Sequence, residues 1–160
     1  MNTKTLHPAT HAAQALGWTD AATGGVVLPV HMATTFQRDP DNQYRRGRSY
    51  GRADNPTYDQ PQALLTVLEG GADSLLFASG MAAAAAVLQS LPRDAHIVAP
   101  RVIYWGLRSW LRKFSEAWGQ EIDFVDATSL DRLRKAVRPG RTRLVWIETP
   151  ANPLWSITDM

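Results

Sequence analysis

The feature that most constrains the fold is an alternation, from Thr57 onward, of short apolar runs with longer amphipathic segments. The apolar runs are typical of buried strands, and the segments between them carry apolar residues at helical spacing. Strands that alternate with helices of this length favour right-handed crossovers and a parallel sheet, and therefore an α/β fold. The predicted strands are Leu75–Ala78, Ile97–Ala99, Ile122–Val125 and Leu144–Ile147.

The helices between these strands have recognisable ends. One ends at Gly70-Gly71, which is a typical C-terminal signal, and another begins at an N-cap at Thr128 or Ser129 and runs to Pro139-Gly140. The clearest amphipathic stripe is Leu107, Trp110, Leu111, Phe114 and Trp118, at the spacing of one buried helix face. The remaining predicted helices are Tyr58–Glu69, Met81–Leu91, Tyr104–Trp118 and a short one near His11–Leu16.

Residues 1–57 differ from the rest, because glycine, proline and polar residues are scattered among short apolar pieces. We expect an extended N-terminal arm over 1–57, followed by an α/β domain over 58–160. A long irregular segment in a compact protein is usually functional or docked on something. Its arginine- and tyrosine-rich part, "QYRRGRSYGRADNPTYDQ" at 43–60, fits an RNA-binding tail, a solubilising patch or a folded loop that grips a phosphate.

Composition narrows the class of protein. A chain of 160 residues with 44% hydrophobic and 20% charged residues can bury the core of about one domain. The net charge of +2 is too small to imply a nucleic-acid partner by itself. The sequence has no cysteine, which excludes disulfides and cysteine nucleophiles and fits a reducing compartment. No signal peptide or membrane span is recognisable, so we expect a soluble, cytoplasmic protein.

Chemistry in an open α/β sheet is expected beyond the carboxyl ends of the strands. Ser79-Gly80-Met81 lies at a helix start, where free N–H groups favour a phosphate, although a plain tight turn explains this stretch equally well. Tyr104 has a ring able to cover an aromatic ligand or simply to pack. Asn152 lies between two prolines, in a binding loop or an ordinary Asn-Pro turn.

Several other site types are disfavoured. The dinucleotide fingerprint Gly-x-Gly-x-x-Gly follows none of the predicted strands. The four histidines show no metal-ligand spacing, so no metal site is expected. Ser79 lacks the Gly-x-Ser-x-Gly elbow of a hydrolase nucleophile.

Three ordered motifs resemble those of the trans-sulfuration (Cys/Met metabolism) family of pyridoxal-phosphate enzymes, such as cystathionine γ-synthase and γ-lyase. They are "SYGRADNPT" at 49–57, "LEGGADSLLFASGMAA" at 68–83 and "ETPANP" at 148–153. The stretch "TGGVVLPVHMATTF" at 23–36 is similar to the entry arm of the family. The resemblance implies a fold of type I, like that of aspartate aminotransferase, with these residues forming part of the large domain.

For the cofactor, pyridoxal 5'-phosphate, the resemblance implies a phosphate site with two halves. Gly80 and Met81 would give backbone N–H groups to the phosphate. Tyr50 and Arg52 resemble the family pair that reaches the same phosphate from a neighbouring subunit, a role for which a planar guanidinium is well suited. The family therefore implies a homo-oligomer, specifically a homotetramer, with shared active sites. Tyr44–Arg48 would then be solvated surface or the rim between subunits.

The resemblance also implies contacts to the cofactor ring. Tyr104 would stack on it, and Asn152 would hydrogen-bond its phenolic oxygen. Glu148 matches a family glutamate near the ring, with a supporting role or as a strand-end carboxylate held by a local arginine. The family usually continues after the tyrosine with Gly and Thr, whereas this chain has Trp105-Gly106-Leu107, which leaves the substrate side of the pocket open.

No catalytic residue is predicted in these 160 residues. The lysine that carries the cofactor as a Schiff base belongs to a Ser-x-Thr-Lys context, and Lys4, Lys113 and Lys135 do not lie in one. We therefore expect an N-terminal fragment of a longer enzyme, inactive alone. The implied reaction forms or cleaves a C–S bond, with cystathionine, homocysteine, methionine or an acylated homoserine as the substrate class. The motif "NPT" at 55–57 favours the γ-type members.

Two alternatives stay open. One is a non-catalytic relic or regulatory fragment that docks on a full-length paralogue, since the phosphate residues would survive in either case. The other is a nucleic-acid module that uses Tyr44–Arg52 for stacking and phosphate contacts, which would leave the ordered motifs after residue 57 unexplained. The leading expectation is an enzyme with no nucleic-acid or membrane partner.

Overall fold

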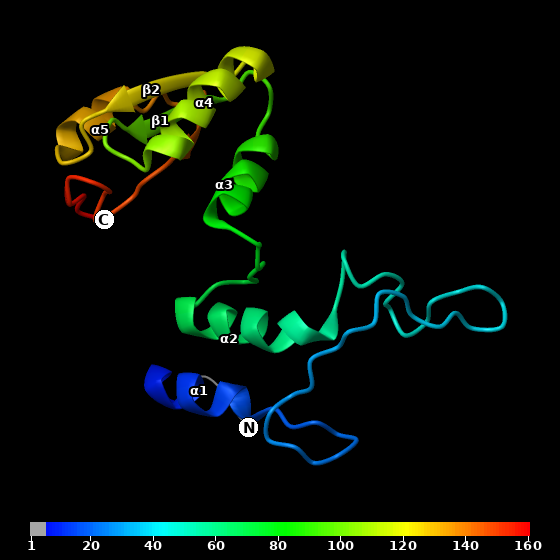
Figure 1. The fold of residues 1–160 in the computed structure, drawn as a ribbon. Helices are drawn as coiled ribbons and strands as arrows, with labels where there is room; N and C mark the ends of the chain where they lie inside the picture. Colours follow the sequence, from blue (N-terminus) through cyan, green and yellow to red (C-terminus); the bar gives the residue numbers. More distant parts are fainter. Residues whose placement is uncertain (1–5) are drawn as a thin grey trace. The chain divides into compact units, whose positions relative to one another are not determined.

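The computed structural model describes residues 6–160, which form two compact units joined between Leu76 and Phe77. In chain order the helices of the first unit are α1 (Pro8–Gln14) and α2 (Asp59–Glu69), and those of the second are α3 (Gly80–Gln89), α4 (Trp105–Trp118) and α5 (Leu130–Ala136) (Figure 1). The strands β1 (His96–Pro100), β2 (Glu121–Val125) and β3 (Thr142–Val145) all belong to the second unit.

The second unit contains a parallel sheet in the order β2-β1-β3. The chain passes from β1 through α4 to β2 on one side, and then through α5 to β3 on the other side of β1. Right-handed crossovers in opposite directions place their helices on opposite faces of a sheet. The chain therefore reverses its direction of travel across the sheet at β1, and such a reversal is where open α/β sheets bind their ligands.

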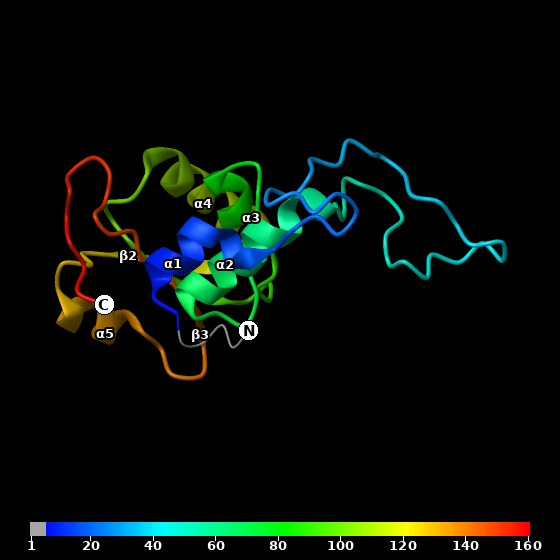
Figure 2. The same cartoon turned by 90° about the horizontal axis from the view of Figure 1, so that it is seen from below.

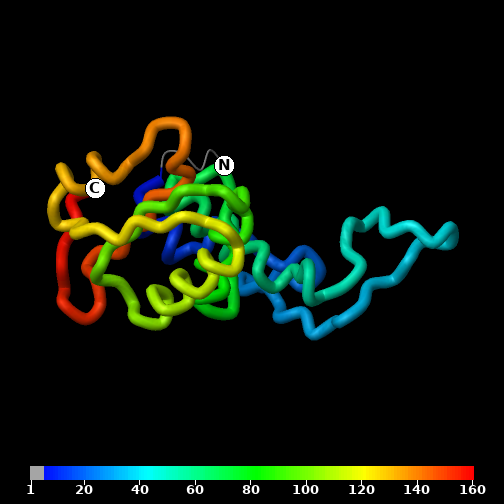
Figure 3. Tube along the Cα trace, turned by 90° about the horizontal axis from the view of Figure 1, so that it is seen from above, coloured from blue at the N-terminus to red at the C-terminus, as the bar shows by residue number. Residues whose placement is uncertain are grey.

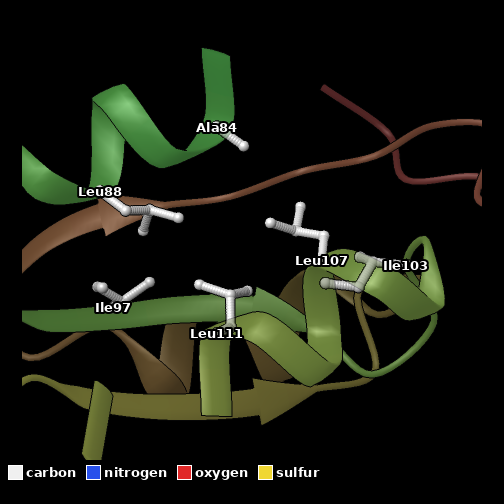
Figure 4. Close-up of a cluster of buried hydrophobic side chains, with 6 residues drawn as sticks. All are labelled: Ala84, Leu88, Ile97, Ile103, Leu107 and Leu111. Carbon is white, nitrogen blue, oxygen red and sulfur yellow. The ribbon is translucent and has the colours of Figure 1, made fainter. Parts of the chain in front are cut away.

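Two apolar clusters cover the two faces of β1. Ile97 points into a cluster with residues of α3 and α4, which Figure 4 shows as facing side chains from those elements. Val98 points to the other face and packs with Leu133 of α5. Alternate residues of a strand face opposite sides, so β1 needs its continuous apolar sequence because both faces are buried. The first cluster comprises Ala84, Leu88, Ile97, Ile103, Leu107 and Leu111.

The helix ends follow the sequence signals. Helix α4 ends at Gly119 and α2 ends at Gly70, each with the positive φ that glycine adopts without cost. Ser129 caps α5 by accepting a hydrogen bond from the Arg132 N–H. Pro61 is tolerated because it lies in the first turn of α2, where no intrahelical N–H bond is lost.

In the first unit α1 and α2 are in contact, and residues 18–55 leave α1 and return to α2 as one long loop (Figures 2 and 3). The loop is held in a defined shape by its own hydrogen bonds. Gly51 N–H donates to the Thr34 carbonyl at 2.8 Å, next to an antiparallel bridge between Thr35 and Tyr50. Asn55 donates to the His31 carbonyl at 3.1 Å. The expected arm is therefore folded locally, and Asn55 of the "NPT" motif fastens it.

Two expectations were wrong in detail. The run Leu75–Ala78 is not a strand, and Leu75 is 70% exposed. An apolar run becomes a strand only when another strand pairs with its backbone. In the described residues β1 already pairs with β2 on one side and with β3 on the other, so β1 is not available to Leu75–Ala78. Arg48 was expected on solvated surface or at the rim between subunits, and the first of these is wrong because Arg48 is half-buried and paired with both Asp54 and Asp59. It therefore ties the loop to the first residue of α2.

Within residues 6–160 no helix has the length and apolar character that a membrane crossing requires.

A cluster of polar side chains joins the three strands near their amino-terminal ends. His96 is fully buried, with its Nδ1 2.8 Å from the Thr142 hydroxyl and its Nε2 3.2 Å from the Asp123 carboxylate. The Thr142 hydroxyl also accepts the Arg138 N–H at 2.7 Å. The side chains of the three strands are thus joined at their starts.

This cluster predicts the effect of Thr142→Val. The substitution leaves the buried His96 Nδ1 and the Arg138 N–H without their partner, so we expect the free energy of unfolding in urea to fall by about 1–3 kcal/mol. Thr19→Val, at an exposed position, is the matched control and should change it by less than about 0.5 kcal/mol. Equal effects of the two substitutions would contradict this role of Thr142.

Candidate functional site

The start of α3 is the stretch that the sequence predicts to bind a phosphate. Ser79, in extended backbone, accepts the Ala82 N–H with its hydroxyl at 3.1 Å and the Ala83 N–H with its carbonyl at 3.1 Å. The N–H groups of Gly80 and Met81 come before the first intrahelical bonds and have no partner within the helix. A Cβ built on Gly80 would meet no heavy atom within 4 Å, so the space beside the Gly80 backbone is open.

Tyr104 follows β1 and occupies the N-cap position of α4. Its ring, 40% exposed, lies against Gly106. A Cβ built on Gly106 would lie 2.7 Å from the ring Cε1 and 3.1 Å from the hydroxyl oxygen. Only glycine fits this close approach without displacing the ring.

Glu148 follows β3 and joins two loops. Its carboxylate accepts the Tyr104 N–H at 3.2 Å and 3.1 Å, one distance to each oxygen, and the Asn152 N–H at 3.1 Å. The alternative that a local arginine holds this carboxylate is wrong for the described residues, where its partners are these two backbone N–H groups. The loop beyond Glu148 contains cis peptide bonds before Pro150 and Pro153.

These elements surround one hollow of about 390 Å³. The start of α3, Tyr104 and Glu148 line it together with apolar residues. This volume lies within the range of small-molecule sites, which are mostly apolar with a few convergent polar groups. The lining residues are Ser79, Gly80, Met81, Ala84, Tyr104, Leu107, Trp146 and Glu148.

The structure thus brings together three of the six residues predicted from the sequence, namely Gly80, Met81 and Tyr104. Asn152 is exposed and does not line this hollow, but its backbone is bonded to Glu148, which does. Asn152 therefore belongs to the same edge of the sheet.

Tyr50 and Arg52 lie in the other unit and form a pair of their own. Arg52 Nη2 donates to the Tyr50 hydroxyl at 2.9 Å, and its guanidinium carbon lies 5.3 Å from the centre of the Tyr50 ring. Both line a separate hollow of about 390 Å³ together with His31 and Asn55. The loop that carries them is the one fastened by Asn55, so the pair is presented on ordered backbone.

A second hollow of the sheet unit was not foreseen from the sequence. It measures about 280 Å³ and lies beyond the carboxyl ends of β1 and β2, with Arg101, Asp126 and Glu148 among its lining residues. The Thr128 hydroxyl and N–H donate to Asp126 and hold the pKa of that carboxyl below its ordinary value. Glu148 is shared by both hollows.

Two structural details near the first hollow were not expected from the sequence, namely the contact of Gly106 with the Tyr104 ring and the two backbone partners of Glu148. Gly106 drew notice only as a departure from the family pattern, although a glycine two residues after a predicted ring-stacking tyrosine indicates close contact. The bridging role of Glu148 has no sequence signal, because its partner Tyr104 is far away along the chain.

The contact between Gly106 and Tyr104 predicts an unusual response to alanine. Replacing a helical glycine with alanine ordinarily stabilises a protein by about 0.5–1 kcal/mol. In Gly106→Ala the new methyl has to push the Tyr104 ring aside, so we expect no gain, or a loss, in the thermal midpoint. Gly80→Ala, whose methyl would enter open space, is the control and should not lower it. An equal rise in both variants would show that the ring does not lie on Gly106.

Comparisons with known proteins give consistent similarities. The profile of the family described as "Cys/Met metabolism PLP-dependent enzyme" matches residues 9–160. The chain is 39% identical to a cystathionine gamma-synthase of Mycobacterium tuberculosis, over 96% of this chain and 39% of the relative. It is 38% identical to a cystathionine gamma-lyase of Bacillus subtilis, over 88% of this chain and 37% of the relative.

Solved structures of proteins with related names are similar to this chain as well. The crystal structure of metB from Corynebacterium glutamicum aligns with a TM-score of 0.89 at 32% identity, covering 99% of this chain and 41% of the other. A cystathionine gamma-lyase from Lactobacillus plantarum, complexed with L-serine, aligns with a TM-score of 0.81 at 31% identity. The chain thus spans about two fifths of the length of the relatives that it matches.

Proposed function

This chain belongs to the Cys/Met metabolism family of PLP-dependent enzymes, and on that premise we propose that it forms the phosphate- and ring-binding part of an enzyme that makes or breaks a C–S bond in a sulfur amino acid. The proposed reaction is of the γ-type, as in cystathionine γ-synthase or γ-lyase. The substrate class is cystathionine, homocysteine, methionine or an acylated homoserine.

The observation that carries the proposal is the hollow at the start of α3. The hollow brings together two helix N–H groups that have no intrahelical partner, open space beside Gly80, and the aromatic ring of Tyr104. The N–H groups suit a phosphate, and the ring of Tyr104 suits an aromatic ligand. When bound, pyridoxal phosphate supplies an electron sink for bonds at the substrate α-carbon. Gly80 and Met81 would hold the phosphate through their N–H groups, and Tyr104 would offer its ring to the aromatic ring of the cofactor.

Asn152 contributes the remaining contact of the sheet unit. Its side chain is exposed, and its backbone is fastened to Glu148, so its amide is available to donate to the phenolic oxygen of the cofactor. Asn152 would thereby help to hold the cofactor in the site.

The second half of the phosphate site comes from another copy of the chain, so the working protein is a homo-oligomer, and a homotetramer in our proposal. Tyr50 and Arg52 are held together on an ordered loop, and Arg52 uses one of its guanidinium donors on the tyrosine hydroxyl. A guanidinium has five donors, so the others can bind phosphate oxygens.

Within residues 6–160 no lysine is placed to carry the cofactor, and Lys4 lies outside the residues that the structure describes. Lys113 and Lys135 lie on α4 and α5 and are exposed, and neither lines the hollow. We therefore propose that the 160 residues are inactive alone. The protein has no cysteine, which fits a reducing compartment, and we place it in the cytoplasm.

Of the two alternatives, a nucleic-acid module is disfavoured by how the arginines are used. Arg45 pairs with Asp39 and Asp41, and Arg48 pairs with two other carboxylates, so much of the positive charge of the loop is neutralised. A non-catalytic relic that docks on a paralogue would keep the same phosphate site. The presence of a lysine in the sequence that the gene encodes beyond codon 160 distinguishes the relic from the enzyme.

The cofactor site is tested with the longest chain that the gene encodes, expressed whole. We expect a visible absorption band of bound pyridoxal phosphate that survives gel filtration, and turnover of cystathionine or an acylated homoserine. Gly80→Ala places a methyl where the phosphate lies and should reduce retention of the cofactor without lowering the thermal midpoint of the cofactor-free protein. Absence of the band in the unmodified protein would contradict the proposal.

The contribution of the loop is tested separately. Arg52→Ala removes the proposed phosphate donors and should weaken retention of the cofactor in the oligomer. Arg46→Ala, exposed in the same loop, is the matched control and should retain the cofactor normally. Equal retention in the two variants would remove Arg52 from the site.

A further inference from the structure

The carboxylate of Glu148 is hydrogen-bonded to both of the loops proposed to hold the cofactor ring. One loop follows β1 and carries Tyr104, and the other follows β3 and carries Asn152. Glu148 accepts the backbone N–H of each, at 3.1–3.2 Å for Tyr104 and 3.1 Å for Asn152.

Among the hydrogen bonds of residues 6–160, those of Glu148 are the ones that join the two loops. Each N–H lies beyond the end of its strand, so the ladder between β1 and β3 does not pair it. The Tyr104 N–H precedes α4 and has no intrahelical partner, and the Asn152 N–H lies in an irregular loop. Hydrogen bonds to an ionised carboxylate are stronger than those between neutral groups, so one side chain can hold both loops.

The contacts of Glu148 also argue against a direct chemical role. Both of its oxygens are engaged by backbone N–H donors, and it is half-buried in the wall of the hollow. Within residues 6–160 no arginine, lysine or histidine forms an ion pair with it. A carboxylate held in this way orients its donors.

We propose that Glu148 is a positioning residue, which fixes the Tyr104 ring and the Asn152 amide relative to one another by binding the backbone N–H of both. This inference rests on the proposed function, because the proposed function has both loops hold the same cofactor. Misplacement of binding groups by about 1 Å can lower a reaction rate about 100-fold. The effect of the Glu148 bridge on the rate can therefore exceed the effect of its few hydrogen bonds on stability.

The first experiment measures the bridge itself, by amide hydrogen exchange in the longest chain that the gene encodes. In Glu148→Ala the Tyr104 and Asn152 amides should exchange together, each about five- to tenfold faster than in the unmodified protein, as expected for loss of one hydrogen bond. Glu148→Gln keeps one acceptor oxygen and should give a smaller change. Glu116→Ala, exposed on α4, is the matched control and should leave both amides unchanged. Unchanged exchange at either amide in Glu148→Ala overturns the bridge.

The second experiment measures the consequence for the cofactor. Added pyridoxal phosphate should show a weaker circular dichroism band in Glu148→Ala than in the unmodified protein, at equal saturation and equal thermal midpoint, with partial recovery in Glu148→Gln. A weaker dichroism band would mean that the cofactor ring is held in a less defined orientation. A role of Glu148 in stability alone would not weaken the band at equal saturation and equal thermal midpoint. If Glu148→Ala fails to fold, the same comparison is made with Glu148→Gln and Glu116→Gln.

The outcomes separate this inference from the function on which it rests. Faster exchange with an unchanged dichroism band would leave the proposed function intact and overturn the positioning role of Glu148. No cofactor band in the unmodified protein would overturn both. Faster exchange with a weakened band, and a normal band in the Glu116 variant, is the result that we expect.

Discussion

The parallel pairing of β1 with both β2 and β3 is the constraint on which the rest of the sheet unit depends. Parallel strands end at the same edge, so the residues that follow β1 and β3 meet although they are far apart in the chain. The pairing is stabilised by burial of both faces of β1 and by the cluster around His96 at the opposite edge. The buried polar cluster joins the strands near their amino-terminal ends. The carboxyl-terminal ends of the strands remain available for loops and for a ligand.

The chain's reversal at β1 explains why the hollow lies where it does. Helix α4 leaves on one face and α5 returns on the other, so no crossover covers the carboxyl ends of β1 and β3. The start of α3 borders this opening and contributes N–H groups that no helical bond uses. Backbone donors, an aromatic ring and a carboxylate that organises two loops thus occupy one place without any of them being adjacent in sequence.

Much of this arrangement was predictable from the sequence, and the failures have physical causes. The α/β fold type was predicted and is confirmed by the similarity to solved relatives. Apolar periodicity found β1, β2, β3 and the helices because it reports burial, but it misassigned Leu75–Ala78, since pairing depends on a neighbour that a local pattern does not reveal. The start of α3 near Gly80 and Met81 was predictable because a helix start is a local feature. The bridge made by Glu148 and the pairing of Arg48 with two carboxylates were not, because they depend on where separate segments meet.

We propose that one phosphate site is built from two copies of the chain, and complementation between two defective variants tests this proposal. Chains carrying Arg52→Ala and chains carrying Gly80→Ala, each in the longest form that the gene encodes, are unfolded together, refolded as a mixture and passed through gel filtration. If the two halves belong to different copies, random pairing across a two-fold axis restores about a quarter of the sites and a corresponding share of the cofactor band. If both halves belong to one chain, every site keeps a defect and the mixture regains no band, which would contradict the account.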